Sequence, residues 1–145
     1  MKRSKGFTLI ELMVVIVILG ILSAVIAPRI PQFVNRAKEG RTKGNLATLR
    51  SSMNIYYSDC DGWYPITDPT TSLVPKYLKK IPICETVKTG HGQQISFDVD
   101  DDAPGADDTG GWGYEDRLTA DAWGDVWVEC SHDDQGNPAV RWTSY

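Results

Sequence analysis

One carboxylate stands alone inside a long apolar stretch near the start of the chain. The stretch runs from Phe7 to Ala27, about 21 residues, and Glu11 is its only ionisable side chain. A helix of this length crosses the hydrocarbon core of a bilayer, because each residue adds about 1.5 Å. A charge at mid-membrane costs about 2.5–3.5 kcal/mol on insertion scales, and less near one end of the span. Glu11 therefore needs a cationic partner wherever the helix packs in a dry protein interface.

The residues before the apolar stretch offer that cation. Residues 1–6, MKRSKG, are short and basic, and basic flanks hold their side of a span in the cytoplasm. A cut between Gly6 and Phe7 would leave the whole span on the mature chain and create an α-amino group at Phe7. Such amines titrate near about 7.7–8.0, so the group is mostly cationic at neutral pH. Glu11 then lies one helical turn away, and the pair can close within one chain or between neighbouring chains.

A second set of carboxylates lies in a short acidic run. Residues 98–108 read DVDDDAPGADD, which holds six aspartates. Carboxylates at alternate positions in a loop suit calcium, a hard cation that takes about 6–8 oxygen ligands. Calcium is the only cofactor that the sequence suggests, and the alternative is a solvated acidic loop. The candidate ligands are Asp98, Asp100, Asp102, Asp107 and Asp108.

Cysteines and histidines are few and have no metal-binding spacing. Cys60, Cys84 and Cys130 are disulfide candidates, and three thiols allow one bridge with one left over, or none. His91 and His132 could be ligands or bases, but solvated loop histidines are the simpler interpretation. Nucleotide-binding and hydrolase motifs are missing from the sequence, so we do not expect an enzyme.

Length and charge limit the chain to an anchor and one small domain. It has 145 residues and a formal net charge of −4. A nucleic-acid partner is not expected, because such a partner needs a basic surface.

The remaining pattern predicts one long helix from Phe7 to about Ser58. Pro28 would loosen this helix, and Gly62 suits a left-handed position after its end. Apolar residues within 32–57 recur at three- and four-residue spacings, which indicates a single stripe that docks on the domain. The stripe comprises Val34, Ala37, Leu46, Leu49, Met53 and Tyr56.

Short strand-like segments follow the helix. They lie at 94–99, 111–114, 125–130 and 139–142 and are separated by Gly- and Asp-rich turns. Period-two alternation and such turns predict a small antiparallel sheet of three to four strands, packed on the helix stripe. The expected fold class is therefore α+β.

The string GFTLIELMVVIVILGILSAVIAP, at residues 6–28, resembles the N-terminal signal of type IV pilins and type II secretion pseudopilins. The resemblance implies cleavage after Gly6 by a prepilin peptidase, N-methylation of Phe7, and pairing of Glu11 with the N-terminal amine of an adjacent subunit. Pro28 matches the proline that bends the family's long helix, and Gly20 matches a helix-softening glycine. The acidic loop resembles the calcium loop of major secretion pseudopilins.

This resemblance implies four segments. Residues 1–6 are a cytoplasmic leader that is removed, 7–28 a transmembrane and assembly helix, 29–58 its amphipathic continuation, and 59–145 an extracytoplasmic domain. The expected product is a filament subunit of a type IV pilus or a type II secretion pseudopilus. Its expected partners are other copies of itself, the prepilin peptidase, an inner-membrane assembly platform and membrane lipid before assembly. The subunit would begin as a single-pass inner-membrane protein with its C-terminal domain in the periplasm. A membrane-tethered, monomeric calcium-binding module is the alternative.

Overall fold

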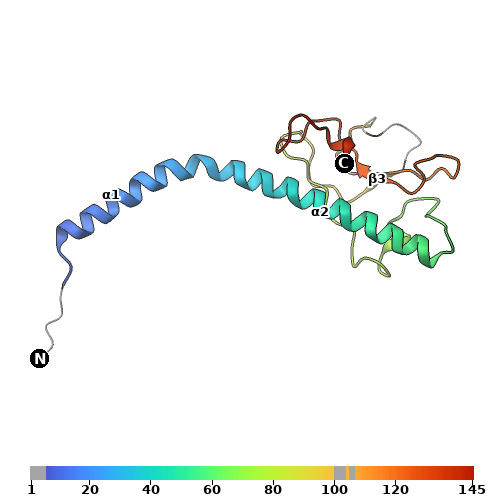
Figure 1. The fold of residues 1–145 in the computed structure, drawn as a ribbon, viewed down its shortest axis with the longest axis horizontal. Helices are drawn as coiled ribbons and strands as arrows, with labels where there is room; N and C mark the ends of the chain where they lie inside the picture. The colour runs from blue at the N-terminus through green and yellow to red at the C-terminus, as the bar shows by residue number, and fades with distance from the viewer. Residues whose placement is uncertain (1–5, 100–103, 105–106) are drawn as a thin grey trace, which may run out of the picture. The chain divides into compact units, whose positions relative to one another are not determined.

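Helices make up the first part of the chain. The computed structural model (Figure 1) describes residues 6–99, 104 and 107–145. Its helices in order are α1 (Leu9–Ile26), the 3₁₀ turn η1 (Ala27–Arg29), α2 (Ile30–Asp59) and the short α3 (Thr70–Leu73). The predicted helix from Phe7 to about Ser58 is confirmed, with the 3₁₀ turn inside it. Pro28 lies in that turn and lacks an N–H, which weakens α-helical bonding there.

Two compact units divide the chain at Asn35. The first ends at Asn35 and contains α1, and the second is Arg36–Tyr145. After α2 ends, Gly62 adopts a positive φ of 88°, as the sequence predicts. Its N–H donates to the Tyr57 carbonyl at 3.0 Å, which satisfies one of the helix's free carbonyl groups.

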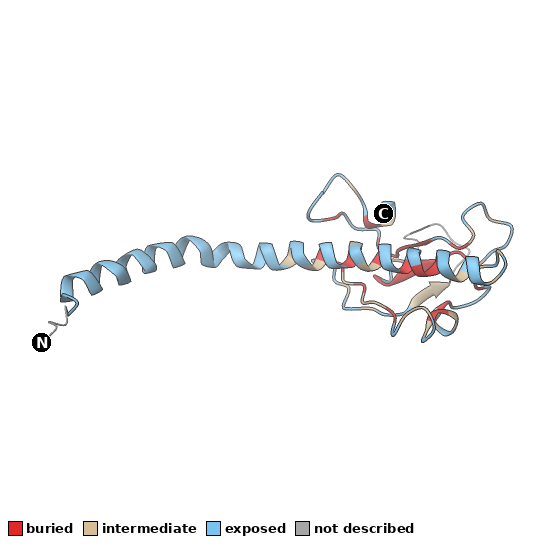
Figure 2. Cartoon of the chain, turned by 60° about the horizontal axis from the view of Figure 1, so that its bottom comes forward, coloured by how far each residue is buried: buried red, intermediate tan, exposed pale blue. Residues whose placement is uncertain are grey.

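One face of α2 packs into the second unit (Figure 2). Leu46, Leu49 and Met53 are buried as predicted, but Val34 and Ala37 are exposed. The buried face instead begins with Glu39 and Thr42, because loops of the domain supply these polar side chains with partners. The Thr42 hydroxyl donates to one backbone carbonyl at 2.9 Å and accepts from a backbone N–H at 3.0 Å. The six buried residues of α2 are Glu39, Thr42, Leu46, Leu49, Ser52 and Met53.

The sheet has three strands, and its pairing corrects one prediction. Strands β1 (Phe97–Val99), β2 (Trp112–Tyr114) and β3 (Val126–Val128) lie in that order. β2 and β3 are antiparallel, as expected, whereas β1 and β2 are parallel. Residues 100–111 connect β1 to β2, and a parallel pair needs a connection of about a dozen residues. The sheet is therefore mixed rather than antiparallel throughout, within a confirmed α+β arrangement.

The predicted fourth strand at 139–142 does not form. Arg141 makes an isolated bridge to Asp133, and the 3₁₀ helix η2 (Trp142–Ser144) follows at once. The Trp142 side chain is fully buried, so the C-terminus is held by packing rather than by a ladder of strand hydrogen bonds.

The core of the second unit forms between α2, the sheet and the loops. β2 and β3 are buried at every residue. Gly113 in β2 lies under the Trp127 ring, and a Cβ atom there would come within 2.1 Å of the indole Nε1. Only glycine fits at this position. The buried apolar cluster comprises Leu46, Leu49, Met53, Leu73, Ile81, Cys84, Trp112, Tyr114, Val126, Val128, Cys130 and Trp142.

Candidate assembly site

A capping box holds Glu11 at the start of α1. Thr8 is the N-cap residue, and its backbone N–H and hydroxyl donate to Glu11 Oε2 at 2.9 Å and 2.7 Å. The Glu11 N–H donates back to the Thr8 hydroxyl at 3.3 Å. Sequence reasoning missed Thr8, although a threonine three residues before a glutamate at a helix start is the capping-box signature. Within the single chain, therefore, Thr8 supports the Glu11 carboxylate and fixes its position.

The rest of α1 is an apolar rod without a partner. Structure is described along the whole of α1, and none of its residues is buried. Apolar side chains project on every side of it, and Phe7 just before it is 90% exposed. Leu9–Asp59 is the only helix among the described residues that is long and apolar enough to cross a membrane, judged by length and composition. A rod of this kind requires lipid or other apolar helices around it.

The processing residues lie next to this rod. Gly6 and Phe7 precede the helix in an exposed segment without regular secondary structure. Gly20 lies inside α1, and a Cβ there would meet nothing within 4 Å, so the glycine is not needed for packing within the chain. Cleavage after Gly6, methylation of Phe7 and bending at Gly20 or Pro28 stay predictions.

The aspartates proposed for calcium do not gather around one point in the described part of the chain. Asp100 and Asp102 fall outside the described residues. Asp98 lies in β1, and its buried Oδ2 has no hydrogen-bond partner among the residues described. Asp107 is exposed, whereas Asp108 turns toward two histidines. Calcium binding by this loop stays a prediction.

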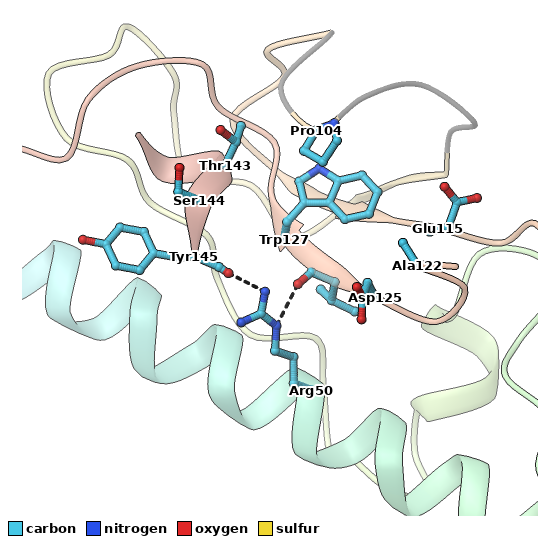
Figure 3. Close-up of a pocket in the computed structure, with 10 residues that line it drawn as sticks. Arg50, Pro104, Glu115, Ala122, Asp125, Trp127, Thr143, Ser144 and Tyr145 are labelled. Carbon is cyan, nitrogen blue, oxygen red and sulfur yellow. Dashed lines mark hydrogen bonds between the residues drawn. The ribbon is translucent and has the colours of Figure 1, made fainter. Parts of the chain in front are cut away.

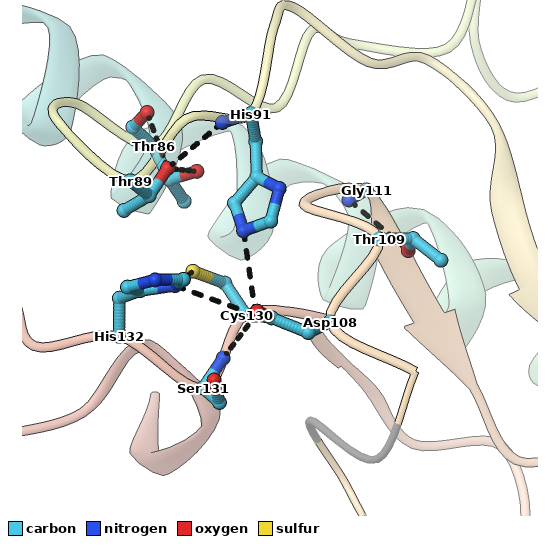
Figure 4. A network of polar contacts seen from close by, with 9 residues as sticks. All are labelled: Thr86, Thr89, His91, Asp108, Thr109, Gly111, Cys130, Ser131 and His132. Carbon is cyan, nitrogen blue, oxygen red and sulfur yellow. Dashed lines mark hydrogen bonds and ion pairs between the residues drawn. The ribbon is translucent and has the colours of Figure 1, made fainter.

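Asp108 instead belongs to a mixed cluster that sequence reasoning missed (Figure 4). His91, Asp108, Cys130 and His132 each place one potential ligand atom within 4.8 Å of the other three. The interpretation of His91 as a solvated loop histidine is wrong, because its side chain is only 16% exposed. The signal was absent from the sequence, since the four residues come from three separate loops.

Burial raises the pKa values of the acidic groups in this cluster, whereas hydrogen bonds from backbone N–H groups lower them. Burial raises the pKa of Asp108, but the Ser131 N–H at 2.7 Å and the two histidines outweigh it, so the pKa is lowered. Burial raises the pKa of the Cys130 thiol. Burial and then the nearby Cys130 raise the pKa of Cys84 to about 12. All three cysteines, which lie within the described residues, are free thiols, and their pairing stays a prediction.

A second polar cluster joins α2 to the C-terminus. Lys43 on α2 pairs with the fully buried Asp134 and donates to the Tyr145 hydroxyl at 2.8 Å. The Tyr145 hydroxyl in turn donates to Asp134 at 2.6 Å. Burial raises the pKa of Asp134, but the hydrogen bonds from Lys43 and Tyr145 outweigh it and lower the pKa. Burial and the charge of Asp134 raise the pKa of Glu39 nearby.

A small pocket of about 190 Å³ lies between α2, β3 and the C-terminus (Figure 3). Arg50 crosses it, donating from Nε to the Val126 carbonyl at 2.9 Å and from Nη2 to the Tyr145 carbonyl. Glu115 at the rim is bonded to Arg117. The polar groups of this pocket therefore hold the fold together, and we assign no chemistry to it.

An exposed apolar helix carrying a capped glutamate, followed by a small α+β domain, defines a pilin-like protein. Residues 1–27 match the family described as Prokaryotic N-terminal methylation motif. The chain is 36% identical over 97 residues to the type II secretion system core protein G of Pseudomonas aeruginosa, covering 57% of this chain and 68% of that protein. The corresponding protein of Klebsiella michiganensis is 30% identical over 135 residues, covering 77% of this chain and 94% of that one.

A pilin matches a shorter part of the chain. The type IV major pilin protein PilA of Myxococcus xanthus is 42% identical over 59 residues, which is 41% of this chain and 27% of that pilin. No solved structure matches the chain. The chain belongs to the pilin and pseudopilin family that includes type II secretion system core protein G.

Proposed function

We propose that the chain is the structural subunit of a pseudopilus-type filament of a type II secretion system. The observation that carries this proposal is the apolar, unburied α1 with a single carboxylate at its start. Taking one large apolar side chain out of water is worth about 1.5–3 kcal/mol. A helix with such side chains on all sides is therefore stable only in lipid or among similar helices.

Before assembly, α1 lies in the inner membrane. The basic residues 1–6 face the cytoplasm, because positively charged flanks stay on that side. Prepilin peptidase then cuts after Gly6, Phe7 is methylated, and the domain lies in the periplasm. A membrane assembly platform moves the processed subunit from lipid into the filament. The N-terminal motif at residues 1–27 supports this sequence of events.

Glu11 selects the axial register of each incoming subunit. Among the residues described in the single chain, its carboxylate accepts hydrogen bonds only from Thr8, at 2.9 Å and 2.7 Å. Between packed helices Glu11 meets the cationic amine of a neighbour's Phe7. A buried charge without such a partner costs several kcal/mol, about 3–5 when one member of a pair is removed. Subunits in a wrong register are therefore rejected.

The extent of similarity favours a secretion pseudopilus over a retractable pilus. The alignment with Klebsiella core protein G extends over 94% of that protein and so includes the globular domain. The alignment with the pilin extends over 59 residues, about the length of the helix. The membrane-tethered calcium-binding monomer finds no such support.

The decisive experiment separates charge pairing from helix capping at Glu11. Glu11→Ala removes both functions, whereas Glu11→Gln keeps an oxygen that accepts from Thr8 but loses the charge. We expect both variants to be processed to a chain that starts at methylated Phe7, as measured by mass spectrometry. We expect both to give no filaments in electron micrographs of sheared or overexpressing cells.

Several outcomes would contradict parts of this proposal. Normal filaments from Glu11→Gln would show that assembly does not need the ion pair. Normal filaments from both variants would show that Glu11 has no role in register. A mature chain that starts at Met1 or after Ala27 would contradict the assembly helix itself. Deletion of the gene distinguishes the two filaments: loss of enzyme export supports a pseudopilus, and loss of surface fibres alone supports a pilus.

A further inference from the structure

The cluster around Asp108 has the dimensions of a tetrahedral metal site. His91 Nε2 and His132 Nδ1 lie 3.3 Å and 3.4 Å from Asp108 Oδ1, and Cys130 Sγ lies 3.5 Å from His132 Nδ1. Zinc binds nitrogen and oxygen ligands at about 2.0–2.2 Å and thiolate sulfur at about 2.3 Å. Tetrahedral angles then separate nitrogen and oxygen ligands by about 3.3–3.4 Å, and nitrogen and sulfur by about 3.5 Å. These three separations match the edges of such a tetrahedron, and all four ligand atoms lie within 4.8 Å of one another.

A buried ring nitrogen in the cluster lies 3.3 Å from the Asp108 carboxylate without forming a hydrogen bond to it. His91 Nε2 is buried and has no hydrogen-bond partner within the described residues. Its ring faces the carboxylate of Asp108 and the ring of His132, whose centre is 5.2 Å away (Figure 4). Buried polar atoms normally have a hydrogen-bond partner, and a bound ion is one explanation for an exception. A cation between the four side chains would satisfy this nitrogen.

Neighbouring groups hold the ligands in place. The Ser131 N–H donates to Asp108 Oδ1 at 2.7 Å, which orients the carboxylate. The His91 N–H donates to the Thr89 hydroxyl at 3.4 Å. Gly110, with φ of 76°, lets His91 come close, because a Cβ at Gly110 would lie 2.4 Å from the His91 Cβ. Hydrogen bonds that orient a ligating carboxylate, as the Ser131 N–H does here, are typical of metal sites in proteins.

We propose that His91, Asp108, Cys130 and His132 bind one zinc ion. Imidazole and thiolate ligands favour zinc, whereas calcium requires about 6–8 oxygen ligands and this cluster offers one carboxylate. On binding, the Cys130 thiol loses its proton to solvent and the thiolate coordinates the metal. The proposal is independent of the filament function, and it concerns a different ion and a different ligand set from the predicted calcium loop.

The proposed ion would be structural. Four protein ligands complete the coordination of zinc and leave no open position for a substrate. The ligands come from the loop before β1, the loop before β2 and the segment after β3. A single ion would therefore join three segments at one end of the strands: the start of β1, the start of β2 and the end of β3. His132 is the most exposed ligand, with 43% of its side chain accessible, and it provides the entry path.

The test uses the full chain in detergent, reduced and freed of metal with a chelator. We expect zinc titration to give one zinc ion per chain by elemental mass spectrometry. Cobalt should give the visible absorption of a tetrahedral site and the near-ultraviolet absorption of a thiolate ligand, and zinc should abolish both. His132→Ala and Cys130→Ser should each weaken zinc binding at least about 100-fold, which exceeds the usual loss when a residue that only hydrogen-bonds to a ligand is changed.

Matched variants keep the test interpretable. Cys60→Ser changes a cysteine outside the cluster and should bind zinc like the parent chain. His132→Ala alters the exposed ligand, so it tests the site even where Cys130→Ser fails to fold. Zinc binding unchanged in His132→Ala would overturn the proposal, as would the lack of stoichiometric zinc in the parent chain. A disulfide between Cys84 and Cys130 in the protein purified without reductant would also overturn it.

Discussion

The two units of this chain treat apolar surface in opposite ways. In α1 the apolar side chains are all exposed, and no residue of this helix is buried by the described part of the chain. In the second unit α2 and the strands close a core in which Leu49, Trp112 and Val126 have no accessible surface. The hydrophobic effect thus stabilises the second unit within a single chain. In α1 the apolar surface stays available for lipid or for other helices. A subunit that must fold before it assembles needs both.

Two glutamates repeat this contrast on a smaller scale. Glu11 is exposed, and its carboxylate is held by the capping contacts of Thr8. Glu39 is 2% exposed, its Oε2 has no hydrogen-bond partner among the described residues, and the carboxylate of Asp134 is nearby. The first glutamate is the one for which we propose a partner in another chain. Burial of the charged Glu39 carboxylate opposes folding of the second unit.

Truncation of one apolar residue in each unit tests the contrast most strongly. Leu49→Ala should lower the free energy of unfolding of the domain by about 2–5 kcal/mol, because Leu49 is fully buried. Ile18→Ala in α1, where Ile18 is 51% exposed, should change it by less than about 0.5 kcal/mol. Denaturant titration in detergent, followed by tryptophan fluorescence, measures both, since every tryptophan lies after α1. A comparable loss in Ile18→Ala would mean that the two units do not unfold independently.

Replacing one glycine by alanine in each unit should change stability in opposite directions. Gly113→Ala would force a Cβ to within 2.1 Å of Trp127 Nε1, and such overpacking costs about 1–3 kcal/mol. Gly20→Ala meets nothing within 4 Å and should stabilise the helix by up to about 1 kcal/mol. Thermal unfolding followed by circular dichroism reports both. Equal stability of Gly113→Ala and the parent chain would show that Trp127 can move aside.

Glu39 should make the domain less stable as the pH rises. Burial and the charge of Asp134 raise the pKa of Glu39 above its ordinary value of 4.5, so folding favours the protonated form. The resulting stabilisation is present below pH 4.5 and is lost as the pH rises through the raised pKa. Glu39→Gln should lack this loss and be more stable than the parent chain at pH 7. Denaturation midpoints between pH 4 and pH 8 measure the difference.

Glu85 provides a control of opposite sign. Its hydrogen bond with Lys38, at 2.8 Å, lowers the pKa of Glu85, so its stabilisation is present above the ordinary value of 4.5. Glu85→Gln should therefore lose stability at neutral pH. A loss at pH 7 in Glu39→Gln as well would show that its contacts with the backbone outweigh the burial of its charge.

The capping residue should have the smallest effect on the domain. Thr8→Ala removes the acceptor of the Glu11 N–H, which lies at 3.3 Å, and costs the first turn of α1 about 1 kcal/mol. Hydrogen exchange at the first amides of α1 should quicken about fivefold, while unfolding of the domain stays unchanged. Thr8→Ser retains the hydroxyl and should exchange like the parent. Unchanged exchange in Thr8→Ala would mean that the cap does not hold the turn.

Local patterns were sufficient for the helical part of the molecule. Apolar periodicity placed the helix from Phe7 to about Ser58, against an observed Leu9–Asp59 for α1, η1 and α2 together. Gly62 was expected in a left-handed position and adopts one. These features depend on contacts between residues that are near in sequence, which is why the sequence displays them. The capping threonine was equally local, and its pattern was present but overlooked.

Contacts between distant residues were decided only by the tertiary structure. The parallel pairing of β1 with β2 depends on which strands meet and in which direction, and strand patterns do not encode this. Glu39 and Thr42 are buried because loops far along the chain reach them. His91 and Cys130 meet for the same reason, since they are far apart in the sequence and come from different loops. The chain by itself determined an apolar helix with one carboxylate near its start. The tertiary structure determined which polar side chains share a site. The cluster around Asp108 forms only because three loops that are separate in the sequence come together at the sheet.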